Sequence, residues 1–353
     1  MKVIIAAGGT GGHIYPGISI AEKLKEKGAE VLFLGTDKGM EANIVPKYGF
    51  RLVTIRTGQF AGKNLGTKAK TLTKVLMGIL DCLRIVKKEK ANAILGMGGF
   101  VSFPCILAGK LVGVDCFLHE QNLTLGLANR ILYRGVKKIF LSFEETAKLY
   151  SIRNYKYTGN PVRKVIKKAT HKKPNGKFRI LVFGGSRGAK RINQAMVELL
   201  PLIDDRDLFA IYHQTGSEDL EWVREAYLKN SISGEIFSFT EEMGYYLGLS
   251  DLVISRAGSS TIFELACTKK PAILVPYPYS AGKHQLKNAL YVERLGAAYV
   301  IADGELSGEV LYRKLMELSR NPDILKAMGE RMGQIYVDDA EERIANEILG
   351  LGS

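Results

Sequence analysis

Several classes of protein are excluded by what this sequence of 353 residues lacks. Its four cysteines are scattered without a Cys-x-x-Cys pair, which excludes a disulfide-dense secreted scaffold and a thiolate zinc site. No apolar run approaches the roughly 18 residues of a membrane-spanning helix, and the N-terminal segment has no signal-peptide anatomy. Hydrophobic residues make up 46% of the chain, too many for a disordered protein. We therefore expect a cytoplasmic, globular protein of two domains.

Acidic residues are scarce in the first half of the chain but not in the second. Residues 1–163 hold 25 Lys and Arg against 11 Asp and Glu, whereas residues 164–353 hold 25 of each kind. The whole net charge of +14 therefore lies in the first half. Segregation of this kind predicts an anionic partner for that half, such as acidic lipid, phosphate groups or nucleic acid, rather than a charged solubility surface.

Short apolar segments alternate with amphipathic helical stretches in both halves, a pattern typical of parallel sheets that helices cover on both faces. A basic stretch with proline and glycine, about residues 160–177, has the composition of a linker. We expect an α/β fold with two doubly wound parallel-sheet domains facing a cleft. Helices are expected at Ile18–Lys27 and Leu72–Lys88, and strands at Lys2–Ala7, Glu30–Leu34, Arg51–Ile55, Ala93–Leu95, Asp115–Leu118, Lys138–Leu141, from Phe178 onward, and at Leu208–Gln214, Glu235–Phe239, Leu252–Ile254, Ala272–Val275 and Ala298–Ile301.

Three glycine-rich turns follow expected strands, at residues 8–13, 96–99 and 184–188. Glycine lets the backbone approach a ligand closely, and a helix that starts after such a turn points its free amides at an anion. One such turn alone is more often a tight connection, but three in one chain favour a phosphate-bearing ligand. None has the Gly-Lys-Ser/Thr ending of a P-loop, which disfavours ATP or GTP hydrolysis. None has the Gly-x-Gly-x-x-Gly spacing of dinucleotide-binding domains either.

His13 stands at the end of the first glycine turn, where a helix is expected to begin. A neutral imidazole there is suited to take a proton from a hydroxyl nucleophile; a histidine that only bonds the backbone at a helix start is the equally weighted alternative. The segment His119-Glu120-Gln121-Asn122 follows another expected strand. It lacks the His-Glu-x-x-His spacing of a zinc pair, so Glu120 and Asn122 are expected to present hydrogen bonds at the strand end.

The segment Ser255–Glu264 is the most specific feature of the second half. Its arginine, serines and threonine follow a strand and open a helix, as in sites that bind a diphosphate, and Glu264 lies one turn further on, suited to accept both hydroxyls of a ribose. A capped helix whose dipole Glu264 complements is the alternative. Asp205-Arg206-Asp207 matches a metal-holding Asp-x-Asp motif but is interpreted as an exposed turn. The sequence requires no cofactor and shows no site for a divalent cation.

The segment 66–90 combines an apolar stripe with basic ends. Such a stretch suits the surface of an anionic bilayer. A helix that packs inside the domain is the alternative, and membrane docking is favoured only if part of the stripe is exposed. The stripe consists of Leu72, Val75, Leu76, Ile79, Leu80, Leu83 and Val86, and the lysines are Lys68, Lys70, Lys74, Lys87, Lys88 and Lys90.

Seven motifs occur together along the chain: GGTGGH at 8–13, GMGGFVSFP at 96–104, HEQN at 119–122, GNPVR at 159–163, GGSRGA at 184–189, SRAGSSTIFE at 255–264 and HQLKNA at 284–289. In this order they resemble the MurG family of bacterial N-acetylglucosaminyltransferases over nearly the whole chain. The resemblance implies a GT-B fold of two Rossmann-like domains. Residues 1–162, joined by a C-terminal helix within 335–353, would form the acceptor and membrane-associating domain, and residues 163–334 the domain that binds UDP-N-acetylglucosamine.

The resemblance also implies the residues of the site. For the nucleotide sugar it implies Arg163, Ser186, Glu264 and the backbone of Thr240 around the nucleotide, Ser259, Ser260 and Thr261 at the diphosphate and sugar, and His284 and Gln285 at the sugar hydroxyls. For the acceptor or the donor sugar it implies Thr10, Gly11, Gly12, His13, Glu120, Asn122 and Asn129, with His13 and Glu120 in catalytic roles. Two positions depart from the family: Phe100 stands where tyrosine is common, and His284 where some members carry glutamine.

The reaction implied by the resemblance is a single inverting displacement. The 4-hydroxyl of the muramoyl sugar of undecaprenyl-linked lipid I attacks the anomeric carbon of UDP-N-acetylglucosamine, giving lipid II and UDP. His13 is the expected base, while helix N-termini with Arg and Ser donors meet the charge of the leaving group. The membrane-bound acceptor fits the basic first half and implies a peripheral protein on the cytoplasmic face of the cell membrane.

Two other functions are alternatives to this one. A non-hydrolysing UDP-N-acetylglucosamine 2-epimerase shares the expected architecture and donor but needs no lipid acceptor, so the basic amphipathic segment argues against it. A basic nucleic-acid-binding protein is the alternative from another class. It requires surface motifs rich in arginine and aromatic residues, which the sequence lacks, so no nucleic-acid partner is expected.

Overall fold

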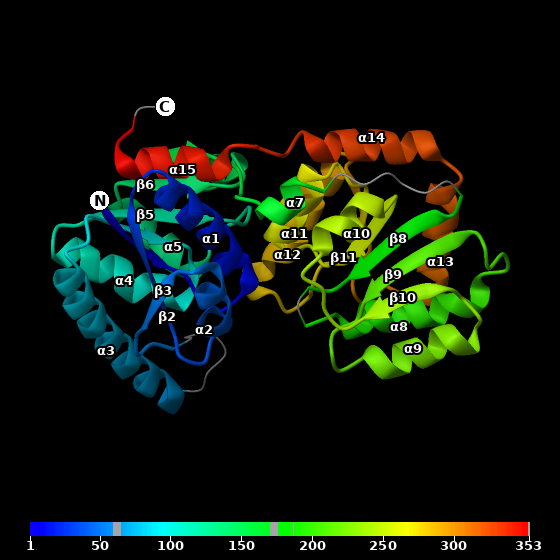
Figure 1. Cartoon of the computed structure of the whole chain (residues 1–353), viewed down its shortest axis with the longest axis horizontal. Coiled ribbons are helices and arrows are strands. Elements are labelled where there is room, and N and C mark those ends of the chain that lie inside the picture. The colour runs from blue at the N-terminus through cyan, green and yellow to red at the C-terminus, as the bar shows by residue number, and fades with distance from the viewer. Residues whose placement is uncertain (59–64, 170–175, 186, 352–353) are drawn as a thin grey trace. The chain divides into compact units, whose positions relative to one another are not determined.

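The computed structural model describes residues 1–58, 65–169, 176–185 and 187–351, with the backbone alone for residues 65–72 (Figure 1). The chain forms two compact units. Unit 1 consists of Met1–Val162 together with Val337–Ser353, and unit 2 consists of Arg163–Tyr336. Each unit contains one parallel β-sheet with helices packed against it. The expected class, an α/β fold with two Rossmann-like domains, is confirmed.

The sheet of unit 1 has seven parallel strands in the order β3-β2-β1-β4-β5-β6-β7. Successive side chains of a strand point to opposite faces. Val3 and Ile5 of β1 therefore enter one apolar core, whereas Ile4 and Ala6 enter a second core on the other face. The strands are β1 Lys2–Ala6, β2 Glu30–Gly35, β3 Arg51–Thr54, β4 Ala93–Gly96, β5 Asp115–Glu120, β6 Lys138–Leu141 and β7 Tyr155–Tyr157.

Helices cover both faces of this sheet. Helix α1 (Gly11–Glu26) and the last helix, α15 (Ala340–Leu349), contribute to one core, and α3 (Leu65–Glu89) and α4 (Gly99–Leu111) contribute to the other. Helix α15 lies beside α1 although the whole of unit 2 separates the two in sequence (Figure 1). The remaining helices are α2 Met40–Ile44, α5 Leu127–Leu132 and α6 Glu145–Tyr150, with single 3-10 turns at Val45–Tyr48 and Tyr133–Gly135.

Helix α15 changes where the net charge lies. Residues 337–353 carry one arginine and five acidic residues. Two of these acidic side chains form ion pairs with lysines of unit 1, Glu342 with Lys27 at 2.9 Å and Glu347 with Lys156 at 3.1 Å. Unit 1 thus holds 25 Lys and Arg against 16 Asp and Glu, a net +9, and unit 2 holds 25 against 20, a net +5. The whole excess lies in residues 1–163, but because residues 337–353 join unit 1, that unit carries only the larger share of it.

Unit 2 also contains one parallel sheet, with six strands in the order β10-β9-β8-β11-β12-β13. Its strands are β8 Phe178–Phe183, β9 Phe209–Gln214, β10 Gly234–Phe237, β11 Leu252–Ser255, β12 Ala272–Leu274 and β13 Ala298–Val300. Its helices are α7 Lys164–Lys167, α8 Lys190–Leu199, α9 Leu220–Lys229, α10 Met243–Leu249, α11 Ser259–Cys267, α12 His284–Arg294, α13 Gly308–Ser319 and α14 Pro322–Gly333, with 3-10 turns at Leu200–Leu202 and Ala281–Lys283.

The strands expected from the apolar pattern are confirmed to within two residues at each end. The pattern missed β7, a three-residue strand of half-buried residues at the edge of its sheet. Helix α1 begins seven residues before the expected Ile18. Gly11, Gly12 and Pro16 are poor helix formers, so intrinsic propensity argues against this first part of α1. Burial of Ile14 in the core overrides that preference.

Both sheets reverse their strand order once, and this reversal positions the candidate site. It lies between β1 and β4 in unit 1 and between β8 and β11 in unit 2. The glycine turns at 8–13 and 96–99 leave β1 and β4, while the turn at 184–188 and the segment 255–259 leave β8 and β11. Open α/β sheets bind ligands beyond the carboxyl ends of their strands at such a reversal. In each unit the sequence motifs therefore converge on the edge suited to binding.

Candidate active site

In unit 1, two glycine turns meet around the imidazole of His13. Gly98 and Gly99 have φ angles of +90° and +73°, a conformation that other residues rarely adopt. A Cβ at Gly98 would lie 3.4 Å from Nε2 of His13, and a Cβ at Gly99 would lie 3.3 Å from Nδ1. The backbone of the turn after β4 thus packs closely against the imidazole of His13, which comes from the turn after β1.

One hydrogen bond fixes the protonation of the His13 ring. Nδ1 lies 3.2 Å from the carbonyl oxygen of Gly8. Because a carbonyl only accepts, Nδ1 carries the proton and Nε2 keeps its lone pair. Burial lowers the pKa of His13, although the hydrogen bond to Gly8 and the charge of Glu41 act in the opposite direction. His13 therefore bonds the backbone at a helix start, as one of the two alternatives expects, and this bond leaves the lone pair of Nε2 free of the backbone.

Glu120, at the end of β5, is buried, and each of its oxygens accepts two hydrogen bonds. Oε1 accepts from the amide (3.1 Å) and Nδ2 (3.2 Å) of Asn122. Oε2 accepts from the amide of Gly126 (2.8 Å) and Nδ2 of Asn129 (2.9 Å). Burial raises the pKa of Glu120, while these donors act in the opposite direction. The carboxylate shapes the loop after β5, so the geometry favours a positioning role for Glu120 over the direct catalytic role that we expected.

Asn129 on α5 connects this loop to the surroundings of His13. Its Nδ2 donates to Glu120 and to the carbonyl of His119 (3.1 Å), and it would lie 3.6 Å from a Cβ at Gly98. Its Oδ1 is buried and has no hydrogen-bond partner among the described residues. Buried polar atoms are normally paired, so an unpaired acceptor at this place fits a position that a ligand occupies.

The start of α1 offers backbone donors beside His13. Thr10 is the N-cap residue, and its carbonyl accepts from the amides of His13 (3.1 Å) and Ile14 (3.2 Å). Its exposed side chain makes no capping hydrogen bond. The amides of Gly11 and Gly12, in the first turn, have no partner further up the helix. They form the positive end of the α1 dipole, which is suited to an anion.

In unit 2, helix α11 begins directly beyond β11 with a turn of hydroxyl residues. Gly258 is the N-cap residue and contributes no side-chain cap, and the first turn of α11 carries the positive end of the helix dipole, which is suited to an anion. The hydroxyl oxygens of Ser255 and Ser260 are buried and have no partner among the described residues. Thr261 lies in the same turn. Ser260 lies in the first turn of α11 and Ser255 ends β11, so the two hydroxyls flank the turn at which a diphosphate is expected.

Glu264, one turn into α11, forms an ion pair with Arg163. Its Oε1 accepts from Nε of Arg163 at 2.9 Å and lies 2.8 Å from a terminal guanidinium nitrogen. The two side chains are 12% and 20% exposed, so the pair is largely shielded from solvent. The resemblance implies that both residues contact the nucleotide. The structure brings the two side chains together, and Arg163 orients Glu264.

Arg256 bonds neighbouring loops of unit 2, which the motif did not suggest. Its guanidinium forms an ion pair with Asp303 and donates to the carbonyl of Val275 (3.1 Å). It also lies over the ring of Tyr277, 5.5 Å from the ring centroid. Arg256 therefore braces the loops after β11, β12 and β13, and the structure does not group it with the hydroxyls of α11 as a phosphate donor.

The two positions expected at the sugar hydroxyls begin α12. His284 is half-buried, with Nδ1 2.7 Å from the carbonyl of Ala281. Oε1 of Gln285 accepts from the amide of Tyr277 at 2.9 Å. Both side chains thus fold back on the loop before α12, and this contact orients them.

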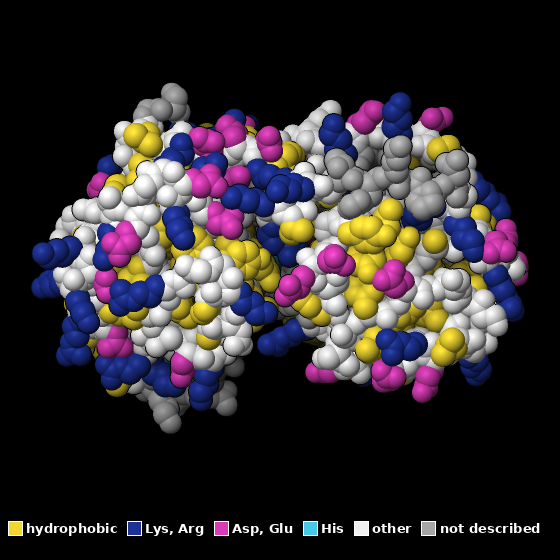
Figure 2. Space-filling model, viewed as in Figure 1, with side chains coloured by type: hydrophobic (Ala, Val, Ile, Leu, Met, Phe, Trp, Pro, Cys, Tyr) yellow, Lys and Arg dark blue, Asp and Glu magenta, His cyan; other side chains and the backbone are white. Residues whose placement is uncertain are grey.

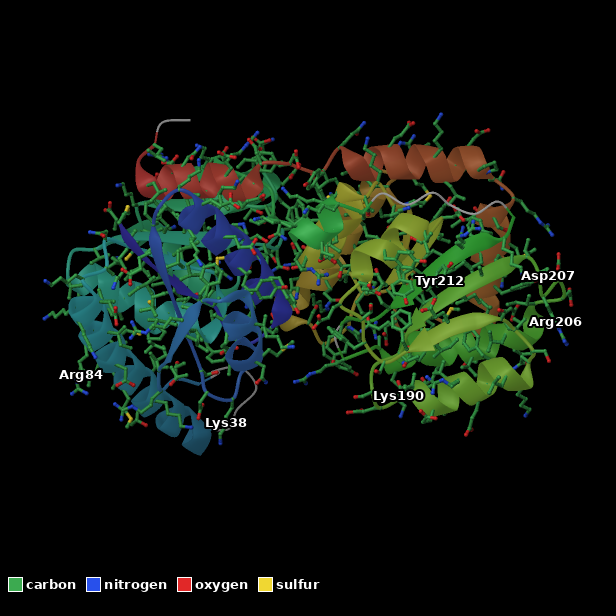
Figure 3. The ribbon with its side chains drawn as sticks, viewed as in Figure 1. Lys38, Arg84, Lys190, Arg206, Asp207 and Tyr212 are labelled. Carbon is green, nitrogen blue, oxygen red and sulfur yellow. The ribbon has the colours of Figure 1, made fainter. Side chains whose placement is uncertain are left out.

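The remaining predicted positions are Thr240 and Ser186, together with the Asp-x-Asp segment. The hydroxyl of Thr240 accepts from the amide of Glu242 (3.0 Å) before α10, and Ser186 falls outside the described residues. Asp207 is exposed and pairs with Lys177, beyond the amino end of β8 and away from the start of α11 (Figure 3). This confirms that the Asp-x-Asp segment is an exposed turn. Within the described part of the chain, no three His, Cys, Asp or Glu side chains are grouped to hold a metal ion.

Comparison with known proteins agrees with this geometry. The glycosyltransferase family 28 N-terminal domain matches residues 3–141, and the family 28 C-terminal domain matches residues 179–344. A protein of Geobacter metallireducens named UDP-N-acetylglucosamine--N-acetylmuramyl-(pentapeptide) pyrophosphoryl-undecaprenol N-acetylglucosamine transferase is 39% identical over 99% of this chain and 98% of its own length. A protein of the same name from Thermodesulfovibrio yellowstonii is 38% identical over 99% of each chain. The crystal structure of Acinetobacter baumannii MurG has a TM-score of 0.82 at 27% identity and covers 99% of both chains.

The chain belongs to the MurG family. Its family 28 domains and its relatives make it a hexosyltransferase, specifically an N-acetylglucosaminyltransferase. A UDP-N-acetylglucosamine 2-epimerase structure matches with a TM-score of 0.70 at 14% identity, which shows a shared fold alone. The epimerase alternative is therefore not favoured.

Two residues around the first glycine turn were not accounted for by the motifs, Phe100 and Glu41. Phe100 replaces the usual tyrosine, and its ring lies 3.1 Å from the place of a Cβ at Gly9, where it packs against the first turn. Sequence reasoning missed Glu41, which is fully buried and accepts a hydrogen bond from the amide of Gly9. An acidic residue at the start of a short helix carries no special signal. The surrounding glycines Gly35 and Gly39 were the available clue.

Proposed function

We propose that this chain transfers N-acetylglucosamine from UDP-N-acetylglucosamine to the 4-hydroxyl of the muramoyl sugar of lipid I, giving lipid II for peptidoglycan synthesis. The observation that carries the proposal is the 39% identity with a transferase of that name over nearly the whole chain. The arrangement of both units supports it. Unit 1 has a basic nitrogen beside unpaired polar groups, and unit 2 has an anion-binding helix start beside an oriented carboxylate.

In the proposed reaction, Nε2 of His13 takes the proton of the acceptor hydroxyl as that oxygen attacks the anomeric carbon of the donor. UDP leaves from the opposite side, so the configuration inverts. The amides at the start of α11 and the hydroxyls of Ser255 and Ser260 stabilise the charge on the leaving diphosphate. Glu264, held by Arg163, accepts hydrogen bonds from the ribose hydroxyls. Asn129, with its unpaired Oδ1, binds a hydroxyl or amide of a sugar.

The lipid acceptor implies that the protein docks on an anionic membrane surface, and α3 supports this. Val75 and Val86 are buried, whereas Leu76 and Leu80 are 54% and 53% exposed. This is the partial exposure of the apolar stripe that the docking hypothesis requires. Lys and Arg side chains gather over the α3 edge of unit 1 in Figure 2. The described ones on α3 are Lys74, Arg84, Lys87 and Lys88.

We therefore propose a peripheral protein on the cytoplasmic face of the cell membrane, with α3 inserted at the level of the lipid headgroups. None of the described helices is both long and apolar enough to cross a bilayer. The net charge of +9 on unit 1 supplies the electrostatic attraction to anionic lipid.

A product assay with both substrates tests the proposed reaction. The purified full-length protein is incubated with UDP-N-acetylglucosamine labelled in the sugar and with a lipid I analogue, and the products are separated. We expect the label in the lipid product, with UDP released in equal amount and a β-linked sugar. Formation of a 2-epimer of the donor without transfer of label to lipid would overturn the proposal in favour of the epimerase.

A further inference from the structure

A buried carboxylate that none of the sequence motifs contains lies under the first glycine turn. Glu41 belongs to α2 and is fully buried. Its Oε1 accepts from the amide (2.9 Å) and the hydroxyl (2.7 Å) of Thr36, and its Oε2 accepts from the amide of Gly9 (3.1 Å). All three donors are neutral groups. A carboxylate buried among neutral groups destabilises the fold relative to an apolar side chain, so stability alone does not account for Glu41.

Three glycines make room for this carboxylate. A Cβ at Gly8 would lie 2.8 Å from Oε1 of Glu41, and a Cβ at Gly39 would lie 2.2 Å from both oxygens. A Cβ at Gly35 would lie 2.5 Å from Cγ. Any larger residue at these places would displace the side chain. Segments after β1, at the end of β2 and before α2 are therefore shaped to hold one carboxylate in one position.

The peptide group between Gly8 and Gly9 connects Glu41 to His13. Its N–H, which belongs to Gly9, donates to Oε2 of Glu41, and its carbonyl, which belongs to Gly8, accepts from Nδ1 of His13 at 3.2 Å. A hydrogen bond at one end of a peptide group polarises it and strengthens the bond at the other end. Both the position and the polarity of the Gly8 carbonyl therefore depend on Glu41.

We propose that Glu41 is the positioning residue of His13, and that it acts through the Gly8–Gly9 peptide group to hold the proton on Nδ1 and leave Nε2 as the base. This rests on the proposed function, in which His13 takes the proton of the acceptor hydroxyl. In the Ser-His-Asp triad a carboxylate bonds the imidazole directly and orients it. Here one peptide group stands between the two, and no proton passes through it.

The charge of Glu41 also affects the basicity of His13. Among the described residues, the titratable side chains with an electrostatic interaction with His13 are Glu41 from α2 and His119 from β5. Burial lowers the pKa of His119 to about 4, so His119 is uncharged near neutral pH. Removing the Glu41 charge therefore lowers the pKa of His13 further. Since the neutral imidazole is the active form, the acidic limb of the rate profile moves to lower pH.

Kinetics of Glu41→Gln in the full-length protein, measured for transfer to a lipid I analogue across pH, test the proposal. We expect kcat to fall about tenfold to a hundredfold, part of what a general base contributes, with the KM for UDP-N-acetylglucosamine unchanged and the acidic limb at lower pH. Glu41→Asp keeps the charge and is expected to keep the acidic limb in place. An unchanged kcat and an unshifted limb in Glu41→Gln would overturn the proposal.

Glu89→Gln is the matched control. The Glu89 carboxylate is 9% exposed, and it pairs with Lys2 (2.9 Å) and Arg51 (3.0 Å) at the amino edge of the same sheet. Its loss removes a buried charge of unit 1 without touching the glycine turns. We expect the pH profile and kcat of this variant to match those of the unsubstituted protein. A shift equal to that of Glu41→Gln would mean that any lost carboxylate of unit 1 has this effect, which contradicts the proposal.

Combination with His13→Ala separates this proposal from the proposed function. If Glu41 acts through His13, Glu41→Gln lowers kcat no further in the His13→Ala background. If the kcat of the double variant instead falls by the product of the two single losses, the proposal is overturned. If His13→Ala alone keeps full activity, the proposed function fails instead. Nitrogen-15 NMR of the unsubstituted protein decides the matter if Glu41→Gln does not fold. A proton on Nδ1 and none on Nε2 is the expected result, and the opposite tautomer contradicts the proposal.

Discussion

The two units place comparable turns at the same point of their sheets, yet their carboxylates have different partners. In unit 1 the anions are internal: Glu41 and Glu120 are buried and bond the backbone of the loops around His13. In unit 2 the carboxylates are instead paired with cations: Glu264 with Arg163, and Asp303 with Arg256. The groups without a hydrogen-bond partner also differ among the described residues: Oδ1 of Asn129 near His13 in unit 1, and the buried hydroxyls of Ser255 and Ser260 in unit 2.

From this difference we propose a separate task for each unit. Carboxylates that fix the loops around an imidazole favour proton transfer, because they hold one tautomer in one place. Arginines that brace the loops around unpaired hydroxyls and helix amides favour binding of an anion, because they keep those donors oriented. The account predicts that damage to unit 1 slows the chemical step and that damage to unit 2 weakens donor binding.

Removal of the base has the largest expected effect. His13→Ala should lower kcat about a hundredfold to ten-thousandfold, the usual contribution of a general base. The KM for UDP-N-acetylglucosamine should stay unchanged, because no donor-binding group is lost. Steady-state kinetics with a lipid I analogue measure both, and circular dichroism checks the fold. A variant with wild-type kcat would remove His13 from the mechanism.

Loss of the ribose carboxylate is expected to come next. Glu264→Ala should raise the KM for UDP-N-acetylglucosamine about tenfold to a hundredfold, as for a lost hydrogen bond to a charged group, with a smaller change in kcat. Arg163→Met should also raise the KM for UDP-N-acetylglucosamine, but by less, because Arg163 acts by orienting Glu264. Donor titrations at saturating acceptor measure both variants. A fall in kcat alone would contradict the assignment of this pair to donor binding.

The exposed leucines of α3 should affect membrane binding and leave chemistry unchanged. The double variant Leu76→Gln, Leu80→Gln should bind anionic vesicles about tenfold more weakly, because two half-exposed side chains lose their burial in lipid. Sedimentation with vesicles of phosphatidylglycerol measures this. Leu228→Gln on unit 2 is the control, since Leu228 is 74% exposed on α9. Equal vesicle binding by the unsubstituted protein, the double variant and Leu228→Gln would show that α3 is not the docking surface.

The ion pairs of α15 have the smallest expected effect. The hydrogen bond from Lys138, with Lys156 nearby, lowers the pKa of Glu347 below its ordinary value. A carboxyl group whose folded-state pKa is depressed stabilises the fold above its unfolded-state pKa and loses this contribution as the pH falls through the folded-state value. Glu347→Gln should therefore lower the free energy of unfolding by about 1 kcal/mol at pH 7 and by less below about pH 4. Urea titrations at both pH values measure the difference, and the same loss at both would contradict this explanation.

The fold was largely predictable because it depends on local patterns. Apolar runs such as Val3–Ala6 are buried on both faces, so their composition alone marks central strands. β7 was missed because its residues are half-buried at an edge, where burial imposes little pattern. The location of α15 depends on contacts between residues more than 300 positions apart, such as Lys27 with Glu342. No local pattern reports such contacts, and the resemblance to the family was what joined this helix to the first domain.

The candidate site was predictable as a set of residues but not as a set of roles. Motifs identified His13, Glu120 and Glu264 as residues of interest. Whether a carboxylate faces a ligand or a loop depends on its hydrogen-bond partners, and Glu120 has four of them within unit 1. Glu41 is invisible to motif reasoning because its importance comes from the peptide group that it bonds. Roles of this kind become apparent only from the distances between atoms.

Binding of UDP alone tests the division of tasks most directly. Isothermal titration calorimetry on the unsubstituted protein, His13→Ala and Glu264→Ala measures the affinity for UDP without acceptor or chemistry. The account predicts that His13→Ala binds UDP as tightly as the unsubstituted protein and that Glu264→Ala binds it about tenfold or more weakly. Equal weakening by the two substitutions, or weakening by His13→Ala alone, would contradict the claim that unit 2 binds the donor and unit 1 supplies the base.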